Sequence, residues 1–447
     1  MPIEIGKLLD QGPWPRFAKL VTLLCALAII FDGFDISIVG FAIPSMIRDL
    51  RLPRASFAPL LVIGFVGMII GSTSAGIVAD RLGRRAALFW SVLVFGVAIV
   101  LSSFAPNLLF IEVLRFIAAA GIGGALPNAA TMSAEFTPLK MRSVAVMLTI
   151  VCVPLGGALA GSVAAWVLPA AGWRALFLVG GIAPLVLSLL MLALMPESPR
   201  FLARKPQRAG ELTRLLGRLK QSVPAGAAFV ESMTDRPETA MSLRDLFGAG
   251  QTRSTLALWL AFFSSLSGIY LCFSWLPTLL SANGLDLSAA SKGLAVYNYG
   301  GVAGVLCFVA LVNRFGSRIL TLAASSLAAL TALLLITIEI KPGSDPVPLL
   351  ATLAAHGFCV NAVQTSLFAL GVHIYPTRVR ASGVAIASAI GRLGAIVSAS
   401  TGSLVIQHGR VQFFEVLTMA AFFSFVGLSI LRNHIPSMGA KKIVTLA

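Results

Sequence analysis

The chain has 447 residues, of which 57% are hydrophobic and only 12% are charged, and its formal net charge is +16 at pH 7. A soluble chain of this length would carry about 25% charged residues. The apolar residues come in runs of about 20 or more, each long enough to cross about 30 Å of bilayer as a helix, so a large soluble protein is excluded.

Twelve candidate transmembrane helices follow one another along the chain. Their centres lie near Asp32, Met68, Phe95, Gly121, Pro154, Pro184, Ser267, Val302, Ala328, Asn361, Leu393 and Phe422. The segment 196–252, between the sixth and seventh spans, is rich in Arg and Lys and contains no run that could span a membrane. The sequence therefore predicts an all-α membrane protein with six-helix bundles at 1–195 and 253–447, joined by a central loop at 196–252.

The distribution of cations predicts the orientation of these spans. Most of the 34 Lys and Arg residues lie in the two termini, in the central loop and in the connections near Arg81, Lys140, Arg314 and Arg378, which all fall on one side if the spans alternate. By the positive-inside rule this side, with both termini, is cytoplasmic. The net charge then reflects topology and contact with anionic lipid, so no nucleic acid partner is expected.

Two carboxylates interrupt the first span, in the stretch FDGFD. Asp32 and Asp35 are three positions apart and therefore share one face of a helix. An ionised Asp at bilayer depth costs several kcal/mol unless it is paired or hydrated. Desolvation and mutual repulsion favour protonation of at least one of them, which is what a proton carrier needs. The alternative is a pair of acids that is permanently protonated or permanently salt-bridged.

Two arginines also fall inside spans. Arg115, about two turns into the fourth span, is the expected partner of Asp32, and arrival of a proton would release this pair; a static ion pair is the alternative. Arg392, in the eleventh span, has no acid at matching depth in its own half. A substrate carboxylate is therefore a reasonable counter-ion, which a guanidinium can hold bidentately, although Asp35 could serve instead.

A benzoate-like ring held by Arg392 would need aromatic walls and a few amide groups. The candidates are Tyr270, Trp275, Tyr297 and Tyr299 for the ring, and Asn128, Asn298, Asn361 and Gln364 for ring hydroxyls. Ordinary helix packing is the competing interpretation of each aromatic residue. His356, in the tenth span, could relay protons or form hydrogen bonds within a polar helix interface. The five cysteines lie in apolar spans without metal-ligand spacing, so no metal site is expected.

Two sequence motifs that occur in both halves of the chain indicate that the halves are related. DRLGRR (80–85) recurs as NRFGSR (313–318), and FTPLKMRSVAV (136–146) recurs as YPTRVRASGVA (375–385), in each case roughly half the chain later. Duplicated six-helix bundles are the architecture of secondary transporters that rock about a site near the bilayer midplane.

At these motifs the chain resembles a known family. GSTSAGIVADRLGRR (71–85) is similar to the cytoplasmic loop signature of the major facilitator superfamily. Within it, DGFD (32–35), LRFIAAAGIGGALPNAATMSAEFTP (114–138), SWLPTLL (274–280) and the stretch 357–395 resemble the aromatic acid:proton symporters. The resemblance implies a cytoplasmic gate built from Asp80, Arg81, Gly83, Arg84 and Arg85, and in the second half from Arg314, Arg378 and Arg380. Asn313 stands where an acid is usual, so the second gate could lack one ionic contact.

The sequence thus favours a monomeric, proton-coupled importer of small aromatic carboxylates in a bacterial cytoplasmic (inner) membrane, working by alternating access without an enzymatic step or a cofactor. A drug or other organic-ion:proton antiporter of the same fold is the main alternative. A sugar or polyol facilitator does not need the intramembrane Arg392. An integral membrane enzyme is disfavoured because nucleotide-binding loops, HExxH and nucleophile–base patterns are absent from the sequence.

Overall fold

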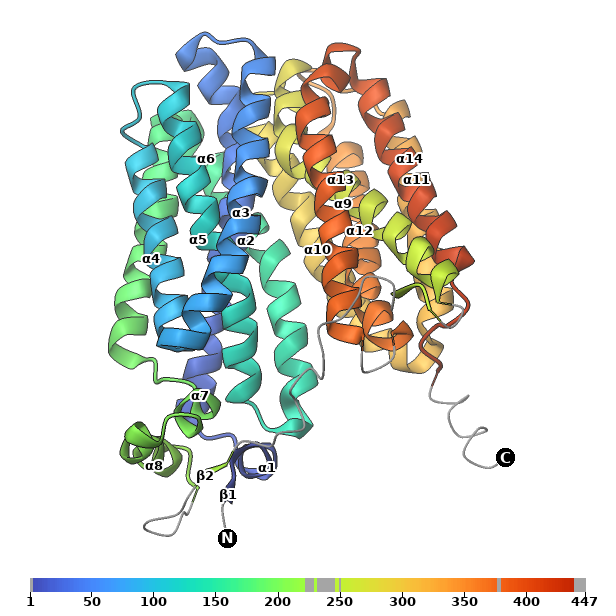
Figure 1. Cartoon of the computed structure of the whole chain (residues 1–447). Coiled ribbons are helices and arrows are strands. Elements are labelled where there is room, and N and C mark those ends of the chain that lie inside the picture. The colour runs from blue at the N-terminus through green and yellow to red at the C-terminus, as the bar shows by residue number, and fades with distance from the viewer. Residues whose placement is uncertain (1–2, 222–228, 231–245, 249–250, 376–378, 438–447) are drawn as a thin grey trace. The chain divides into compact units, whose positions relative to one another are not determined.

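A computed structural model describes residues 3–221, 229–230, 246–248, 251–375 and 379–437. The long helices are α2 (Arg16–Leu50), α3 (Ala58–Leu82), α4 (Arg84–Ser102), α5 (Leu108–Glu135), α6 (Leu139–Leu194), α9 (Thr252–Ala282), α10 (Leu287–Phe315), α11 (Ser317–Thr337), α12 (Pro346–Ile374), α13 (Arg380–Gln407) and α14 (Arg410–Ile430) (Figure 1). The shorter elements are β1 (Ile3–Glu4), α1 (Ile5–Gln11), η1 (Arg54–Phe57), α7 (Pro199–Ala203), η2 (Pro206–Arg208), α8 (Ala209–Arg218) and β2 (Phe229–Val230).

Eleven helices in the described part of the chain are long and apolar enough to cross a membrane, one fewer than the twelve predicted spans. The difference lies in α6, which covers the predicted fifth and sixth spans in one continuous assignment. Within it Gly172 has φ 72° and ψ −173°, which is not a helical conformation. Glycine adopts positive φ without steric cost, so the chain turns there without a separate loop. Residues 139–171 and 173–194 are therefore two spans, and the twelve-helix fold is confirmed.

The chain divides into two compact units. Unit 1 comprises residues 1–35, 63–156 and 174–236, and unit 2 comprises residues 36–62, 157–173 and 237–447. The boundaries cut through α2, α3 and α6, so each of these helices contributes residues to both units. The division of the chain at 195 and 252 into two bundles and a loop stays a prediction.

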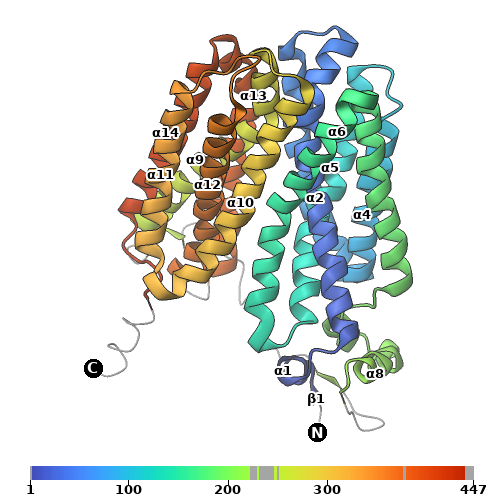
Figure 2. The same ribbon diagram turned by 180° about the vertical axis from the view of Figure 1, so that it is seen from behind.

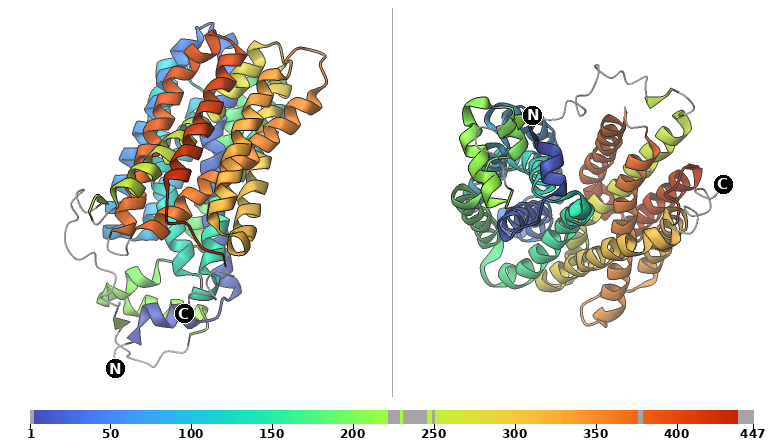
Figure 3. Two further views of the ribbon diagram at one scale, coloured as in Figure 1. Left: turned by 90° about the vertical axis from the view of Figure 1, so that its right-hand side faces the viewer. Right: turned by 90° about the horizontal axis from the view of Figure 1, so that it is seen from below.

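Each unit is held together mainly by helix packing. In unit 2, α9 to α14 form one bundle (Figures 1 and 2). In unit 1, α4 lies beside α5, and the short elements α1, α7 and α8 gather at one end of the unit (Figure 3, left). There β1 pairs in parallel with β2, and the guanidinium of Arg218 stacks 3.6 Å from the ring centroid of Phe17. This contact fixes α8 against the start of α2.

Close approach of helix backbones shapes the packing of α10 against α12. A Cβ on Gly304 of α10 would lie 2.7 Å from the carbonyl carbon of Phe358 in α12, closer than real Cβ atoms come. Within a bilayer, small residues let helices meet at their backbones, because dispersion contacts rather than the hydrophobic effect drive their association. The close packing of α10 against α12 therefore requires a glycine at position 304.

Replacing Gly304 with Val is expected to destabilise unit 2 by about 1–3 kcal/mol, because the added methyl groups would force α10 away from α12. The thermal unfolding midpoint of the detergent-solubilised protein measures the effect. Gly76→Val is the matched control, since Gly76 is also in a membrane span and has nothing within 4 Å of its Cβ position. Equal midpoints for the two variants would contradict the packing described.

Candidate functional site

The buried charges of unit 1 lie on α2 and α5. Asp32 and Asp35 of α2 are 2% and 1% exposed, and Arg115 of α5 is largely covered. The guanidinium Nη1 of Arg115 donates a hydrogen bond to Oδ2 of Asp35, forming an ion pair between the two helices. The other oxygen of Asp35, Oδ1, is buried and has no hydrogen-bond partner among the described residues. The pair therefore leaves one carboxylate oxygen of Asp35 without a hydrogen-bond donor in the described part of the chain.

The expected pairing of Arg115 with Asp32 is wrong, since the acid that it contacts is Asp35. The reason is depth. Successive spans alternate in direction, so the end of α2 at Leu50 and the start of α5 at Leu108 lie on the same side. A helix rises 1.5 Å per residue, so Arg115 lies about 10 Å along α5 from this side. Along α2, Asp35 lies about 5 Å nearer to the same side than Asp32 does, so Asp35 is closer in depth to Arg115.

Arg115 also lies against α3. A Cβ on Gly64 would be 3.1 Å from Nε of Arg115, so this glycine leaves space for the guanidinium. The arginine is thus enclosed by α2, α3 and α5. Burial of this kind makes a charge pair costly to separate, because neither partner can be solvated in place.

Unit 2 holds Arg392 and most of the residues predicted to bind a ligand. Arg392 of α13 is half-buried and makes no ion pair or hydrogen bond with any residue that the structure describes. An intramembrane guanidinium without a counter-ion is unfavourable, so a bound anion would stabilise it. The role of Arg392 as a carboxylate clamp stays a prediction.

The amides of unit 2 have free hydrogen-bonding capacity. Asn298 donates from Nδ2 to Leu294 O at 3.0 Å, and its buried Oδ1 lacks a partner among the described residues. Gln364 accepts a hydrogen bond of 2.9 Å from Ser265 at Oε1, while its Nε2 is buried without a described acceptor. Asn361 donates from Nδ2 to Gly357 O at 3.0 Å. In unit 1, Asn128 likewise donates from Nδ2 to Gly124 O at 2.8 Å. Asn298 and Gln364 thus each keep one buried polar atom without a described partner.

The aromatic candidates differ in their surroundings. Trp275 is fully buried, and its Nε1 donates to Ala399 O at 3.0 Å, so it ties α9 to α13. Tyr297 is fully buried and stands edge-on to Phe273. Tyr270, half-buried, also stands edge-on to Phe273. Tyr299 is 45% exposed, and its hydroxyl lies 3.0 Å from Ser162 Oγ. Packing therefore accounts for Trp275, and a ligand contact of the tyrosines stays a prediction.

The predicted gate of unit 1 contains a polar network around two glutamates that sequence reasoning missed. Nε of Arg84 lies 3.3 Å from Oε1 of Glu135, and the hydroxyl of Ser198 donates to Oε2 of the same carboxylate. The carboxylate of Glu197 accepts from the backbone N–H of Arg85 at 3.1 Å and of Ser198 at 2.8 Å. The network joins α4, α5 and the start of α7.

The remaining gate residues are placed differently. Asp80 and Arg81 are exposed and have no ion pair with another described residue. Gly83 and Gly316, which correspond in the two repeats, have φ of 104° and 76°, and each joins two consecutive spans in the same way. Arg314 is exposed and lies 5.4 Å from the ring centroid of Phe315. Arg378 and the side chain of Arg380 are outside the described residues.

Replacing Glu135 with Gln is expected to lower the stability of unit 1 by about 1–3 kcal/mol, because a buried carboxylate that accepts from Arg84 and Ser198 loses its charge. The thermal unfolding midpoint in detergent measures this change. Glu211→Gln is the control, since Glu211 pairs with Arg208 at an exposed site, where ion pairs contribute little. If both variants unfold at the wild-type temperature, the buried network does not stabilise the unit.

The described residues contain no cluster of metal-ligating side chains. No group of three or more His, Cys, Asp or Glu side chains there could hold a metal ion, and all five cysteines are free.

Comparison with known proteins identifies the family. The model of the Major Facilitator Superfamily matches residues 25–399 and, in an overlapping match, residues 258–442. The chain is 34% identical to the gallate transporter of Pseudomonas putida, over 99% of this chain and 98% of that one. It is 35% identical to the 4-hydroxybenzoate transporter PcaK of Acinetobacter baylyi, over 90% of this chain and 88% of that one.

Among solved structures, the partially occluded inward-open form of the xylose transporter XylE from E. coli resembles this chain with a TM-score of 0.73, over 94% of this chain and 99% of that one. The sequence identity is 17%, so this likeness shows the fold alone. The chain is therefore a multi-pass membrane transporter rather than an enzyme, and it belongs to the major facilitator superfamily, within the group that contains these aromatic acid transporters.

Proposed function

We propose that this chain imports small aromatic carboxylates together with protons across a bacterial cytoplasmic membrane, as a monomer with both termini in the cytoplasm. The bundles at 1–195 and 253–447 would rock about a central site, with the segment 196–252 on the cytoplasmic side. The similarity to transporters of gallate and 4-hydroxybenzoate supports the substrate class.

The observation that carries the proposal is the buried ion pair of Asp35 with Arg115. In its ionised form the pair holds α2 to α5. A proton that binds to the carboxylate would remove its charge and weaken the contact, so protonation would bias the bundle toward a second arrangement. The free Oδ1 of Asp35 is the position where such a proton could bind without displacing a hydrogen bond.

Arg392 supports an anionic substrate, because it is the intramembrane cation of unit 2 and has no described counter-ion. A carboxylate could bind it bidentately. The free Oδ1 of Asn298 could accept a hydrogen bond from a ring hydroxyl, and the free Nε2 of Gln364 could donate one to a substrate oxygen. Tyr270 and Tyr297 would supply the aromatic wall.

The two acids of α2 set the possible proton stoichiometry. One proton carried with a monovalent anion moves no net charge. Two protons, with Asp32 as the second carrier, would move one positive charge inward, worth about 2.3 kcal/mol per 100 mV of membrane potential. Uptake would then respond to potential as well as to pH.

Competition in a counterflow assay tests the substrate class. Proteoliposomes loaded with unlabelled 4-hydroxybenzoate are given the labelled acid outside, with benzoate, gallate, xylose or a cationic dye as competitor. Competition by the aromatic acids, with none from xylose or the dye, is expected. Competition by the dye without competition by benzoate or gallate would instead favour an organic-cation antiporter.

A further inference from the structure

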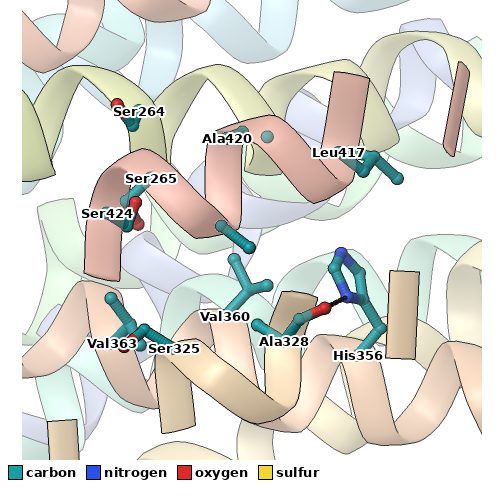
Figure 4. A pocket seen from close by; sticks show the side chains of 12 residues that line it. Ser264, Ser265, Ser325, Ala328, His356, Val360, Val363, Leu417, Ala420 and Ser424 are labelled. Carbon is teal, nitrogen blue, oxygen red and sulfur yellow. Dashed lines mark hydrogen bonds between the residues drawn. The ribbon is translucent and has the colours of Figure 1, made fainter. Parts of the chain in front are cut away.

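Two of the four histidines of the chain, His356 and His434, are shielded from solvent in different places. His356 is 2% exposed and lines a small cavity inside unit 2 (Figure 4), where its Nδ1 lies 3.1 Å from Ala328 O. His434 is half-buried and lies beyond the end of α14, outside the membrane spans. A change in the pH of the surrounding solution therefore reaches His434 directly, whereas His356 is enclosed by the bundle.

The segment that contains His434 lies against the turn that joins α10 to α11. The backbone N–H of Ser317 donates to Ile435 O at 2.9 Å, and the N–H of Ile435 donates to the hydroxyl oxygen of Ser317 at 2.8 Å. The ring Nδ1 of His434 lies 3.4 Å from the same hydroxyl oxygen. Gly316 leaves room for this contact, since a Cβ there would be 3.0 Å from Ile435 O. Residues 434–437, the C-terminal strap, are thus held on the turn by reciprocal hydrogen bonds.

The corresponding turn of unit 1 makes a similar contact with a different side chain. Gly83 and Gly316 occupy equivalent places in the repeats DRLGRR and NRFGSR. In unit 1 the segment that follows α6 supplies Glu197, whose carboxylate accepts from the backbone N–H of Arg85 at 3.1 Å. In unit 2 the segment that follows α14 supplies His434. An imidazole changes its charge between about pH 5 and 8, so the contact in unit 2 contains a group that titrates near neutral pH.

The surroundings of His434 disfavour a protonated ring. Burial lowers the pKa of His434, and the charges of Arg318 on α11 and His373 on α12 lower it further. The backbone carbonyls of Leu428 and Leu431 act in the opposite direction, and no carboxylate in the described part of the chain forms an ion pair with the ring. Because the ring binds a proton less readily on the turn than in water, the contact is strongest above about pH 6.5 and weakens as the pH falls.

We propose that the C-terminal strap is a pH-sensitive contact, which leaves the turn between α10 and α11 when His434 is protonated. The imidazolium would otherwise stay half-buried and facing Arg318, whereas release of the strap exposes it to water. The orientation proposed above puts the strap in the cytoplasm, so its physiological role rests on the proposed function, although the contact itself does not. Protons that enter with the substrate would then act on the strap, and the transporter would respond to the pH that its own activity creates.

Hydrogen–deuterium exchange of the detergent-solubilised protein tests the proposal without transport. The amides of Ser317 and Ile435 are the reporters, because each donates a hydrogen bond across the contact. At pH 5.5 a histidine with the ordinary pKa of about 6.5 is about nine-tenths protonated once the strap is free. After correction for the intrinsic exchange rate, protection of both amides is therefore expected to fall by about 3- to 10-fold between pH 7.5 and 5.5. Equal protection at the two pH values would overturn the proposal.

Two variants assign the pH dependence to one ring. His434→Asn keeps a hydrogen-bonding group near Ser317 but does not titrate, so its protection should be the same at both pH values. His408→Asn is the matched control, because His408 is an exposed histidine at the end of α13 whose Nδ1 lies 2.9 Å from Leu404 O of that helix. It should show the same fall as the wild type. A fall in His434→Asn as large as that in the wild type would overturn the proposal.

Discussion

Replacing Asp35 with Asn is expected to reduce proton-driven uptake by about 100-fold or more. The substitution keeps the shape of the side chain but removes the charge that faces Arg115. The guanidinium would then be a buried cation without its counter-ion, a change that typically costs about 3–5 kcal/mol. In addition, an amide cannot take up a proton at this position, so the pH gradient would no longer act on the contact between α2 and α5.

Initial uptake rates in proteoliposomes with an inward proton gradient measure this effect. Glu112→Gln is the matched control, because Glu112 is a half-buried acid on the same helix as Arg115 and makes no ion pair with a described residue. The charge-reversed double variant Asp35→Arg with Arg115→Asp should recover part of the lost uptake. Wild-type coupling in Asp35→Asn would exclude Asp35 as the proton-coupling residue.

Replacing Arg392 with Lys is expected to raise the KM for aromatic carboxylates by about 10- to 100-fold. Lysine keeps the positive charge but cannot present two parallel N–H donors to a carboxylate. The loss should therefore appear in substrate binding more than in the maximal rate. Uptake measured over a range of 4-hydroxybenzoate concentrations separates these two effects.

A neutral analogue of the substrate shows whether the effect of Arg392→Lys depends on the carboxylate. Inhibition of transport by 4-hydroxybenzamide, which lacks the carboxylate, should be nearly the same for the wild type and Arg392→Lys. Arg432→Lys is the control, since Arg432 is an exposed cation just after the end of α14 and has no role in the proposed site or gate. An unchanged KM for the carboxylate in Arg392→Lys would mean that the clamp lies elsewhere.

Much of the fold could be predicted because hydrocarbon imposes a simple rule on the sequence. A span needs an apolar run of about 20 residues, and such runs are visible without any knowledge of packing. The turn at Gly172 shows the limit of that rule. The chain reverses there within α6 without the polar loop that normally separates two spans, and only the backbone conformation reveals where one helix ends.

The candidate site could be predicted only in its composition. Ionisable residues inside apolar runs stand out, which is how Asp35, Arg115 and Arg392 were found. Their pairing depends on depth to within one helical turn, and hydropathy does not define depth that finely. Glu135 is the last residue of α5, and Glu197 lies in the short connection between α6 and α7, both places where an acid is unremarkable. Both were missed because only the fold brings Arg84 and Ser198 to Glu135 and the backbone N–H of Arg85 to Glu197.

The most direct measurement is the uptake of labelled 4-hydroxybenzoate and gallate into proteoliposomes, with the pH gradient and the membrane potential imposed separately. Accumulation driven by an inward proton gradient is expected for at least one of the two acids. A further response to an inside-negative potential would indicate two protons per anion. Failure to accumulate either acid under both gradients would contradict proton-coupled import of aromatic carboxylates.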